Sequence, residues 1–273
     1  MHTTDLILRH ETLLRICSFL TIMLIMWRWE IAFPKRPLNV NKPMRWANNL
    51  GLLFLNSLVL RLALPFAGVG MAVWCQQKGW GLFNTLSDGL VPSVVSVTIS
   101  IIVLDFAVYL QHRVMHQVPL LWRLHRVHHL DLDIDLSTGL RFHPLEILLS
   151  MLFKFLVITL LGPSALAVML FEILLNGSAV FNHSNIAITH RIDAWLRRFI
   201  VTPDMHRVHH STQMHETNSN YGFFLSCWDR LLSTYIAQPE AGHHNMQIGL
   251  AEYRDQELTQ KLRPLLLSPF RRN

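Results

Sequence analysis

The chain has 273 residues, of which 51% are hydrophobic and only 15% are charged, and its formal net charge is +6. Its mean hydropathy of +0.29 suits a membrane protein better than a soluble domain of this length. The three cysteines lie far apart, which excludes a disulfide framework or a thiolate metal site as the organising feature. The basic residues are dispersed between apolar segments, so we expect no nucleic-acid partner.

Five apolar stretches predict membrane-spanning helices. They are Leu13 to Phe33, Asn49 to Cys75, Leu90 to Leu110, Leu145 to Leu161 and Ser164 to Phe181. Because the second contains Arg61 and Pro65, it is either one tilted span or an interfacial piece followed by a span. Gly162 and Pro163 indicate a turn, which predicts that the last two stretches form a transmembrane hairpin.

The lysines and arginines between these stretches alternate along the chain. The connections 34–49 and 112–144 carry four each, the connection 76–89 carries one, and the hairpin turn carries none. By the positive-inside rule, this alternation predicts an outside N-terminus and a cytoplasmic C-terminus in an inner or plasma membrane. We therefore expect an all-α, polytopic helical bundle capped by a cytoplasmic, histidine-rich helical domain.

Eight of the 16 histidines lie in three short clusters. These are His112-Arg-Val-Met-His116, His125-Arg-Val-His128-His129 and His206-Arg-Val-His209-His210. Residues three and four apart project from one face of a helix, so the rings within each cluster can converge. Neutral imidazole is the commonest metal ligand, and eight rings are too many for one ion, which predicts a pair of metals. Surface histidines or a pH sensor are the alternatives, and repetition of the pattern disfavours them.

Ionisable side chains are costly at membrane depth, so each one calls for a partner or a function. Asp105 precedes His112 by seven residues and returns to nearly the same helix face. Its carboxylate is expected either to accept the second N–H of a ligand histidine or to hold a residue of the adjoining span. Lys154 and Glu172 are nearly equidistant from the hairpin turn, and we predict that they pair at mid-membrane.

Glu172, Asn176 and His183 share one face of the fifth stretch and form a polar path toward the clusters. This pattern predicts His183 as a ninth ligand, with a buried core histidine as the alternative. His143 has no spacing partner, and we expect a structural or outer-shell role for it. The remaining histidines near the clusters or in the tail are not predicted to be ligands: His190, His215, His243 and His244.

The segment 191–200 combines apolar and basic residues at helical spacing. Ile192, Trp195, Leu196 and Phe199 can share one face, opposite Arg191, Arg197 and Arg198. This pattern is typical of an interfacial helix that lies on a membrane. An ordinary amphipathic helix packed on the core is the alternative.

The three clusters resemble those of the fatty acid hydroxylase / sterol desaturase superfamily of membrane non-haem iron oxygenases. The family pattern is His-x3-His, His-x2-His-His and (His/Gln)-x2-His-His, and residues 112–116, 125–129 and 206–210 match it. Further motifs from Asp105 to Tyr235 extend the match, including Arg141-Phe-His-Pro-Leu-Glu146 and Asn182-His183-Ser-Asn185. The resemblance is closer to bacterial and alkylglycerol monooxygenase-like members than to eukaryotic sterol enzymes.

The resemblance implies a di-iron centre at the cytosolic mouth of a helical bundle, with the eight cluster histidines as ligands. His183 lies near the position where relatives supply another ligand, and Asn220 is expected to orient the last cluster through its side-chain amide. Asp105, His143, Glu172 and Asn176 are further supporting residues. The corresponding division of the chain is an anchor (1–104), a catalytic domain (105–240) that contains the 145–181 hairpin, and a polar tail (241–273).

The implied reaction is hydroxylation of a C–H bond of a lipid by dioxygen, on a fatty acyl, sterol-like or alkylglycerol-type substrate. A desaturase with the same metal site is the alternative. The sequence contains no dinucleotide-binding, iron–sulfur or haem-carrier motif, so a separate ferredoxin, flavodoxin or haem carrier with its reductase is implied. Two other classes fit less well. An intramembrane zinc hydrolase would be expected to carry His-Glu-x-x-His, which is absent, and a metal-handling membrane protein would spread its ligands through the spans.

Overall fold

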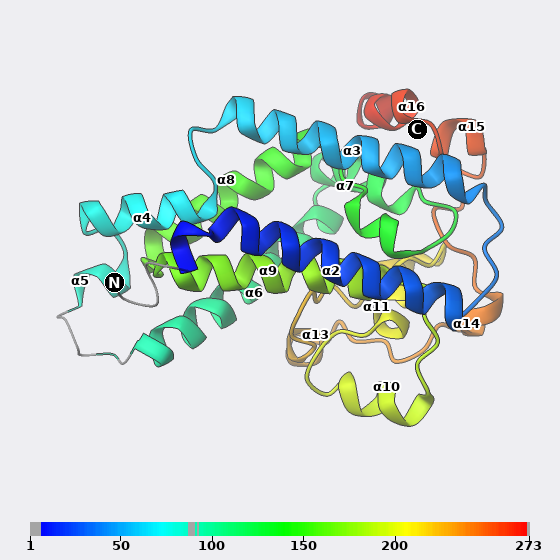
Figure 1. The fold of residues 1–273 in the computed structure, drawn as a ribbon. Coiled ribbons are helices and arrows are strands. Elements are labelled where there is room, and N and C mark those ends of the chain that lie inside the picture. The colour runs from blue at the N-terminus through cyan, green and yellow to red at the C-terminus, as the bar shows by residue number, and fades with distance from the viewer. Residues whose placement is uncertain (1–6, 87–90, 92, 272–273) are drawn as a thin grey trace.

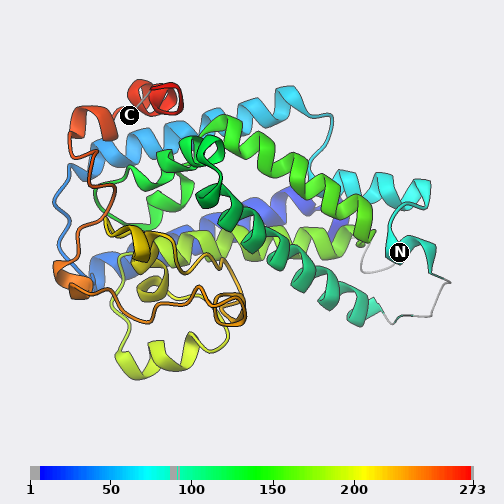
Figure 2. The same cartoon turned by 180° about the vertical axis from the view of Figure 1, so that it is seen from behind.

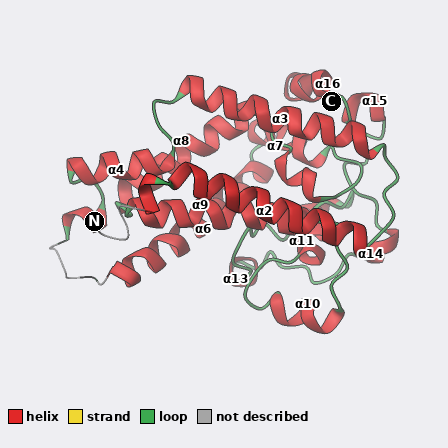
Figure 3. Ribbon diagram, viewed as in Figure 1, coloured by secondary structure: helices red, strands yellow, loops and turns green. Residues whose placement is uncertain are grey.

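The computed structural model describes residues 7–86, 91 and 93–271, and the regular elements in these residues are all helices (Figures 1 and 3). The predicted all-α class is confirmed. The longer helices are α2 (Glu11–Ala32), α3 (Lys42–Ala63), α4 (Gly68–Lys78), α6 (Ser93–Gln117), α8 (Pro144–Leu161) and α9 (Ala165–His183).

The shorter helices gather toward one end of this bundle, whereas α4 and α5 lie at the other end (Figures 1 and 2). We use the name cap for the part of the chain that these shorter helices form. The short elements are α5 (Leu82–Thr85), α7 (Pro119–His129), η1 (Leu136–Leu140), α10 (His190–Leu196), α11 (Pro203–His209), α12 (Met214–Thr217), α13 (Cys227–Leu231), α14 (Gly242–Asn245), α15 (Gln256–Thr259), α16 (Leu262–Leu267) and η2 (Ser268–Phe270). All of them except α5 belong to the cap.

Within the described residues, five helical stretches are long and apolar enough to cross a membrane, as predicted. They are Glu11–Ala32, Lys42–Thr85, Ser93–Gln117, Pro144–Leu161 and Ala165–His183. The predicted start of the third span, Leu90, lies outside the described residues. The protein is therefore an integral membrane protein by helix length and composition.

The second stretch is not the single continuous helix that one interpretation of its sequence required. It begins with α3, which has 22 residues and is about 33 Å long, enough to span a bilayer alone. The helix breaks around Pro65 because proline disfavours helical geometry in the residue before it. The shorter α4, of 11 residues, follows the break. The span-length helix α3 therefore comes first, and the shorter α4 follows it.

The hairpin of α8 and α9 is built as predicted. Gly162 ends α8 in the left-handed conformation (φ 67°), and the Ser164 hydroxyl accepts a hydrogen bond from the Ala167 N–H to begin α9. Lys154 Nζ lies 2.8 Å from Glu172 Oε1, which confirms the predicted pair. Arg15 of α2 is a third partner that the sequence did not predict, with Nη2 2.8 Å from Glu172 Oε2.

A buried charge network joins α3 to the cap. Arg45 is fully buried, and its guanidinium donates to Asp131 Oδ1 at 2.8 Å and to Asp135 Oδ2 at 3.1 Å. Asp135 also caps η1, where it accepts a hydrogen bond from the Ser137 N–H. Arg45 is one of the cations in the predicted inside-positive connection, so a structural role accounts for it as well. The orientation in the membrane remains a prediction.

The C-terminal segment, predicted as a polar tail over 241–273, packs on α3 and α7 in its described part, 241–271. Leu265 is fully buried in an apolar cluster with Leu52 of α3 and Val127 of α7. Two buried arginines of the cap, Arg126 and Arg141, donate hydrogen bonds to backbone carbonyls of this segment. The segment therefore covers one side of α7.

Helix α10 is arranged inside out for a helix that packs on a core. Asp193 of α10 and Arg197, which follows the helix, are buried and paired, whereas Ile192 (54% exposed), Trp195 (58%) and the nearby Phe199 (58%) face outward. The alternative of an ordinary amphipathic helix, with its apolar face packed on the core, is therefore wrong. The interfacial position of this helix remains a prediction.

Candidate metal centre

Nine histidines gather in two groups where α6, α7, α9 and α11 meet. Within each group, one ring nitrogen per residue lies within 4.8 Å of those of the other members, a spacing that could hold a metal ion. Group A consists of His112, His116, His125, His129 and His209, and group B consists of His128, His183, His206 and His210. These are the nine histidines that the sequence singled out.

Helical spacing explains how two clusters serve both groups. On α7, His125 and His129 are four residues apart and face group A, whereas His128 lies on the side of group B. The same division holds at α11, where His206 joins group B and His209 joins group A. Each His-x-x-His-His cluster therefore bridges the two groups and fixes the distance between them.

Hydrogen bonds to the outer ring nitrogens orient six of the nine histidines, and the longest of them joins His116 Nδ1 to Asn218 Oδ1 at 3.4 Å. The Nδ1 atoms of His112, His128, His183 and His209 contact the carbonyl oxygens of Tyr221, Arg141, Ala179 and Ser219 at 2.6 to 3.2 Å. The Nδ1 atom of His125 contacts a carboxylate oxygen of Glu146 at 2.6 Å. An Nδ1–H that donates to oxygen leaves the Nε2 lone pair free to bind a metal.

The inner ring nitrogens face one another without suitable donors. His112 Nε2 lies 3.1 Å from His125 Nε2, and His183 Nε2 lies 3.0 Å from the Nε2 atoms of His128 and His206. Further buried ring nitrogens have no hydrogen-bond partner among the described residues. They belong to His116, His129, His206, His209 and His210. Buried polar atoms normally have partners, and a metal ion would satisfy these. The donor set therefore fits two metal ions.

Five of the nine histidines, on α7 and at α11, are held in the neutral form that binds metals. Eight of the nine are buried, and His116 is partly exposed. Burial, followed by the neighbouring histidines, lowers the pKa of His128, His129, His206 and His210 well below the usual value. The same causes lower the pKa of His209 to about 3.

Glu146 is a site residue that the sequence analysis did not assign. It lies in the first turn of α8, is buried, and accepts the short hydrogen bond from His125 Nδ1. Its place in Arg141-Phe-His-Pro-Leu-Glu146 and its lack of a basic partner could have identified it. His143 of the same motif has a structural role, because its Nδ1 caps α8 and its Nε2 contacts the Leu266 carbonyl oxygen at 3.2 Å.

Two of the other supporting residues, Asp105 and Asn220, form hydrogen bonds with backbone groups. Among the described residues, Asp105 has no hydrogen bond to a histidine. Its carboxylate accepts hydrogen bonds from the N–H groups of Phe224 and Leu225 and from Trp228 Nε1. The expected partner, either a ligand histidine or a residue of an adjoining span, is therefore wrong. Asp105 instead holds the segment around α13. The side chain of Asn220 donates to the carbonyl oxygen of Met205, which precedes His206. This contact suits the expected orienting role of Asn220.

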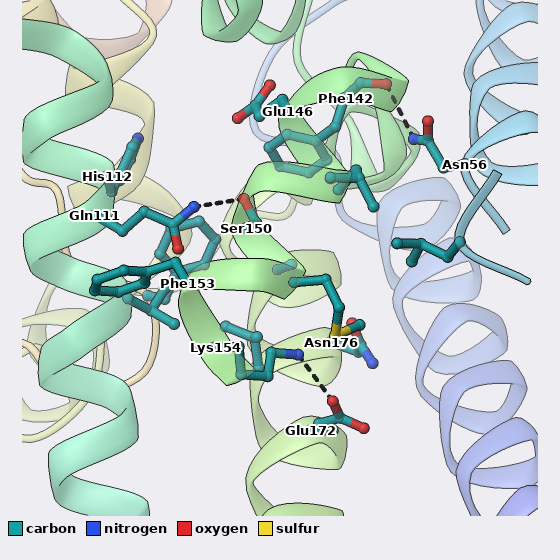
Figure 4. Close-up of a pocket in the computed structure, with 18 of the residues that line it drawn as sticks. Asn56, Gln111, His112, Phe142, Glu146, Ser150, Phe153, Lys154, Glu172 and Asn176 are labelled. Atoms are coloured by element: carbon teal, nitrogen blue, oxygen red, sulfur yellow. Dashed lines mark hydrogen bonds and ion pairs between the residues drawn. The ribbon is translucent and has the colours of Figure 1, made fainter. Parts of the chain in front are cut away.

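A cavity of about 370 Å³ connects group A to the interior of the bundle. Figure 4 shows His112 and Glu146 toward one end and the Lys154–Glu172 pair toward the other. Most of its lining is apolar, with side chains from α2, α3, α6, α8 and α9. Glu146 and Lys154 are eight residues apart on α8, so the cavity extends about 12 Å along this helix. Asn176 and Glu172 also line it.

Comparison with known proteins gives matches in the same region. The family described as "Fatty acid hydroxylase" matches residues 97–234. Alkylglycerol monooxygenase of Homo sapiens is 30% identical over 141 residues, which is 50% of this chain and 29% of the relative. Ornithine lipid hydroxylase OlsE of Rhizobium tropici is 29% identical over 149 residues, which is 54% of this chain and 44% of the relative. The chain thus matches less than half the length of these relatives. No solved structure is significantly similar to it.

Proposed function

Because the chain belongs to the fatty acid hydroxylase family, we propose that it is a membrane-bound di-iron oxygenase. The reaction would hydroxylate a C–H bond of a lipid, using dioxygen and electrons from outside the chain. The observation that carries this proposal is the connection of group A to a largely apolar cavity within the membrane-spanning bundle. A lipid chain in that cavity would have one of its carbons beside His112 and His125.

We assign the five histidines of group A to one iron ion and the four of group B to the other. Bound iron would supply the electron transfer that activates dioxygen and oxidises an unactivated C–H bond. The five histidines whose Nδ1 atoms are hydrogen-bonded to oxygen at 3.2 Å or less would hold the ions through Nε2, and those hydrogen bonds fix the ring orientations. Imidazole ligands alone also suit zinc, so the metal must be measured.

The chain's own side chains would bind and position the lipid. Phe142, Leu140 and Met115 form apolar walls near group A, and Leu104, Val157 and Phe171 continue the apolar lining along the bundle. Removing apolar chain from water supports binding in such a cavity, and the same walls exclude water from the reacting carbon. The position of the oxidised carbon would depend on how far the lipid chain can enter the cavity.

The names of the relatives, a monooxygenase and a hydroxylase, favour hydroxylation over desaturation. A zinc hydrolase would require only three protein ligands beside a water, whereas nine histidines converge here. We propose that a separate ferredoxin, flavodoxin or haem carrier with its reductase supplies the electrons. We also propose a cytoplasmic cap and an outside N-terminus, as the charge alternation predicts.

The test compares metal content and lipid products of the wild type, His128→Ala and His215→Ala. His215 is an exposed histidine outside both groups, so its variant is the matched control. The proteins are produced with added iron, and lipid extracts are searched by mass spectrometry. In the wild type and the control we expect two irons per chain and a lipid that gains one oxygen. In His128→Ala we expect less iron and loss of the oxidised lipid. A loss of two hydrogens would establish a desaturase. Tight zinc without any lipid change, even with a reductase system, would overturn the proposal.

A further inference from the structure

One polar side chain of the cavity lining has no hydrogen-bond partner among the residues that the structure describes. Asn56 donates from its amide to the Phe142 carbonyl oxygen at 3.0 Å. Gln111 donates to Ser150, and Lys154 pairs with Glu172 (Figure 4). Asn176 also lines the cavity, but its amide has no hydrogen bond to any described residue and is exposed. It lies on α9, seven residues and about 10 Å before His183.

The charges near Asn176 are already balanced inside the chain. Glu172, one helical turn before Asn176, contacts Lys154 Nζ and Arg15 Nη2, each at 2.8 Å. The second carboxylate near Arg15 is Glu11, at 2.7 Å. Two cations therefore face two carboxylates. A ligand beside Asn176 would find neither a free cation nor a free carboxylate, which favours an uncharged group.

The exposed lining residue Ser57 of α3 indicates that the cavity opens to the outside of the bundle between α2 and α3. These helices lie side by side on one face, with α8 and α9 behind them (Figure 1). Helix α2 packs on α9, whereas α3 packs on η1 and α8. The lining includes Arg15 and Phe19 from α2 and Ser57 and Leu60 from α3, and Ser57 is exposed. Both helices belong to stretches that are apolar enough to span a membrane, so this opening faces lipid.

An amide exposed at membrane depth loses free energy unless something hydrogen-bonds to it. We propose that bilayer lipids enter the cavity between α2 and α3, and that Asn176 hydrogen-bonds an uncharged polar group of the bound lipid. Such a group is a hydroxyl, ether, ester or amide near the start of the chain. The chain beyond it would extend about 10 Å to the histidines, so Asn176 would set which carbon reaches them. This inference rests on the proposed function for its reaction, but not for lipid binding.

The first test removes the amide. Asn176→Leu keeps a side chain of similar size, Asn176→Gln keeps the amide, and Thr98→Val is the control that removes a polar group on α6 outside the cavity. Each full-length protein is purified in nanodiscs made from host lipid. Native mass spectrometry identifies the lipids that remain bound, and mass spectrometry of extracts locates the added oxygen. Unfolding temperature and metal content check the fold.

One lost hydrogen bond predicts a drop of about three- to tenfold in retained lipid and a similar rise in KM. The added oxygen should also scatter over several carbons. Asn176→Gln should recover part of the retention, and Thr98→Val should match the wild type. If Asn176→Leu retains the same lipids in the same amounts and oxidises the same carbon, Asn176 has no such role. Retention that depends on Asn176 without any oxidised product would support the lipid site and overturn the proposed function.

The second test blocks the opening. Ser57→Trp places a large ring at the proposed entrance, whereas Leu62→Trp places the same ring on a part of α3 that is 78% exposed and outside the cavity lining. We expect Ser57→Trp to lower lipid retention and product at least tenfold without loss of metal, and Leu62→Trp to leave both unchanged. Equal retention by the two variants would show that lipid enters elsewhere.

Discussion

Glu146 offers the sharpest test of how the histidine groups bind metal. Its Oε1 atom lies 2.6 Å from His125 Nδ1, and the carboxylate is 4% exposed. Removal of such an outer partner typically lowers metal affinity about 10- to 100-fold, equivalent to about 1.4 to 2.8 kcal/mol. Because His125 belongs to group A alone, Glu146→Ala should weaken one metal ion and leave the ion of group B in place. Glu146→Gln keeps an acceptor oxygen and should lose less.

The assay is anaerobic competition between the purified protein and a chelator, with bound metal counted at each chelator concentration. The wild type should release both metal ions over one range of high chelator concentrations. Glu146→Ala should release half of its metal at a lower chelator concentration. Glu257→Ala is the matched control, because it removes an exposed carboxylate whose partner is Lys261. If Glu146→Ala releases both ions as the wild type does, Glu146 does not support His125. If both ions are lost together, the division into two groups is wrong.

Three further results are expected. Glu172→Leu leaves Lys154 and Arg15 without their buried counter-charge and should destabilise the protein by about 3–5 kcal/mol, measured by denaturant unfolding in detergent. Adding Lys154→Met should restore part of the lost stability. An unchanged unfolding midpoint in Glu172→Leu would show that the ion pairs do not stabilise the fold. The low pKa of His209, about 3, means that only the unfolded state binds a proton as pH falls below about 6.5. Metal-free protein should therefore unfold more easily at pH 5.5 than at pH 7.5, and equal midpoints would contradict this. Trp195 should contact lipid, so Trp195→Phe should reduce fluorescence quenching by brominated lipid, and unchanged quenching would place α10 away from the membrane.

The local sequence pattern was sufficient to predict those features that depend on residues close together along one helix or across one turn. The three- and four-residue spacings brought eight histidines together because a helix places such residues on one face. His183 was found because its face of α9 carries the other polar residues of that span. Lys154 and Glu172 were paired from their distance to Gly162, since a tight turn fixes which residues of two antiparallel helices lie opposite.

Contacts between distant segments were missed because no local pattern encodes them. Asp105 was expected near His112, yet its partners are more than a hundred residues away in sequence. Arg15 reaches Glu172 only because α2 packs along α9, which helix periodicity does not predict. The polarity of the C-terminal segment likewise concealed Leu265, whose burial depends on apolar partners from α3 and α7.

The buried charges of the cap have a direct connection to group B. Arg45 holds Asp131 and Asp135 on either side of the turn that leads into η1. Within η1, a Cβ atom added to Gly139 would lie 2.7 Å from the Ala179 carbonyl oxygen and 3.2 Å from His183 Nδ1. The missing side chain therefore allows η1 to approach α9 closely, at the carbonyl that orients His183. The network that anchors η1 to α3 thus also fixes the position of a candidate metal ligand. This explains why so many charged residues are buried beside the histidines, although burial of charge is costly.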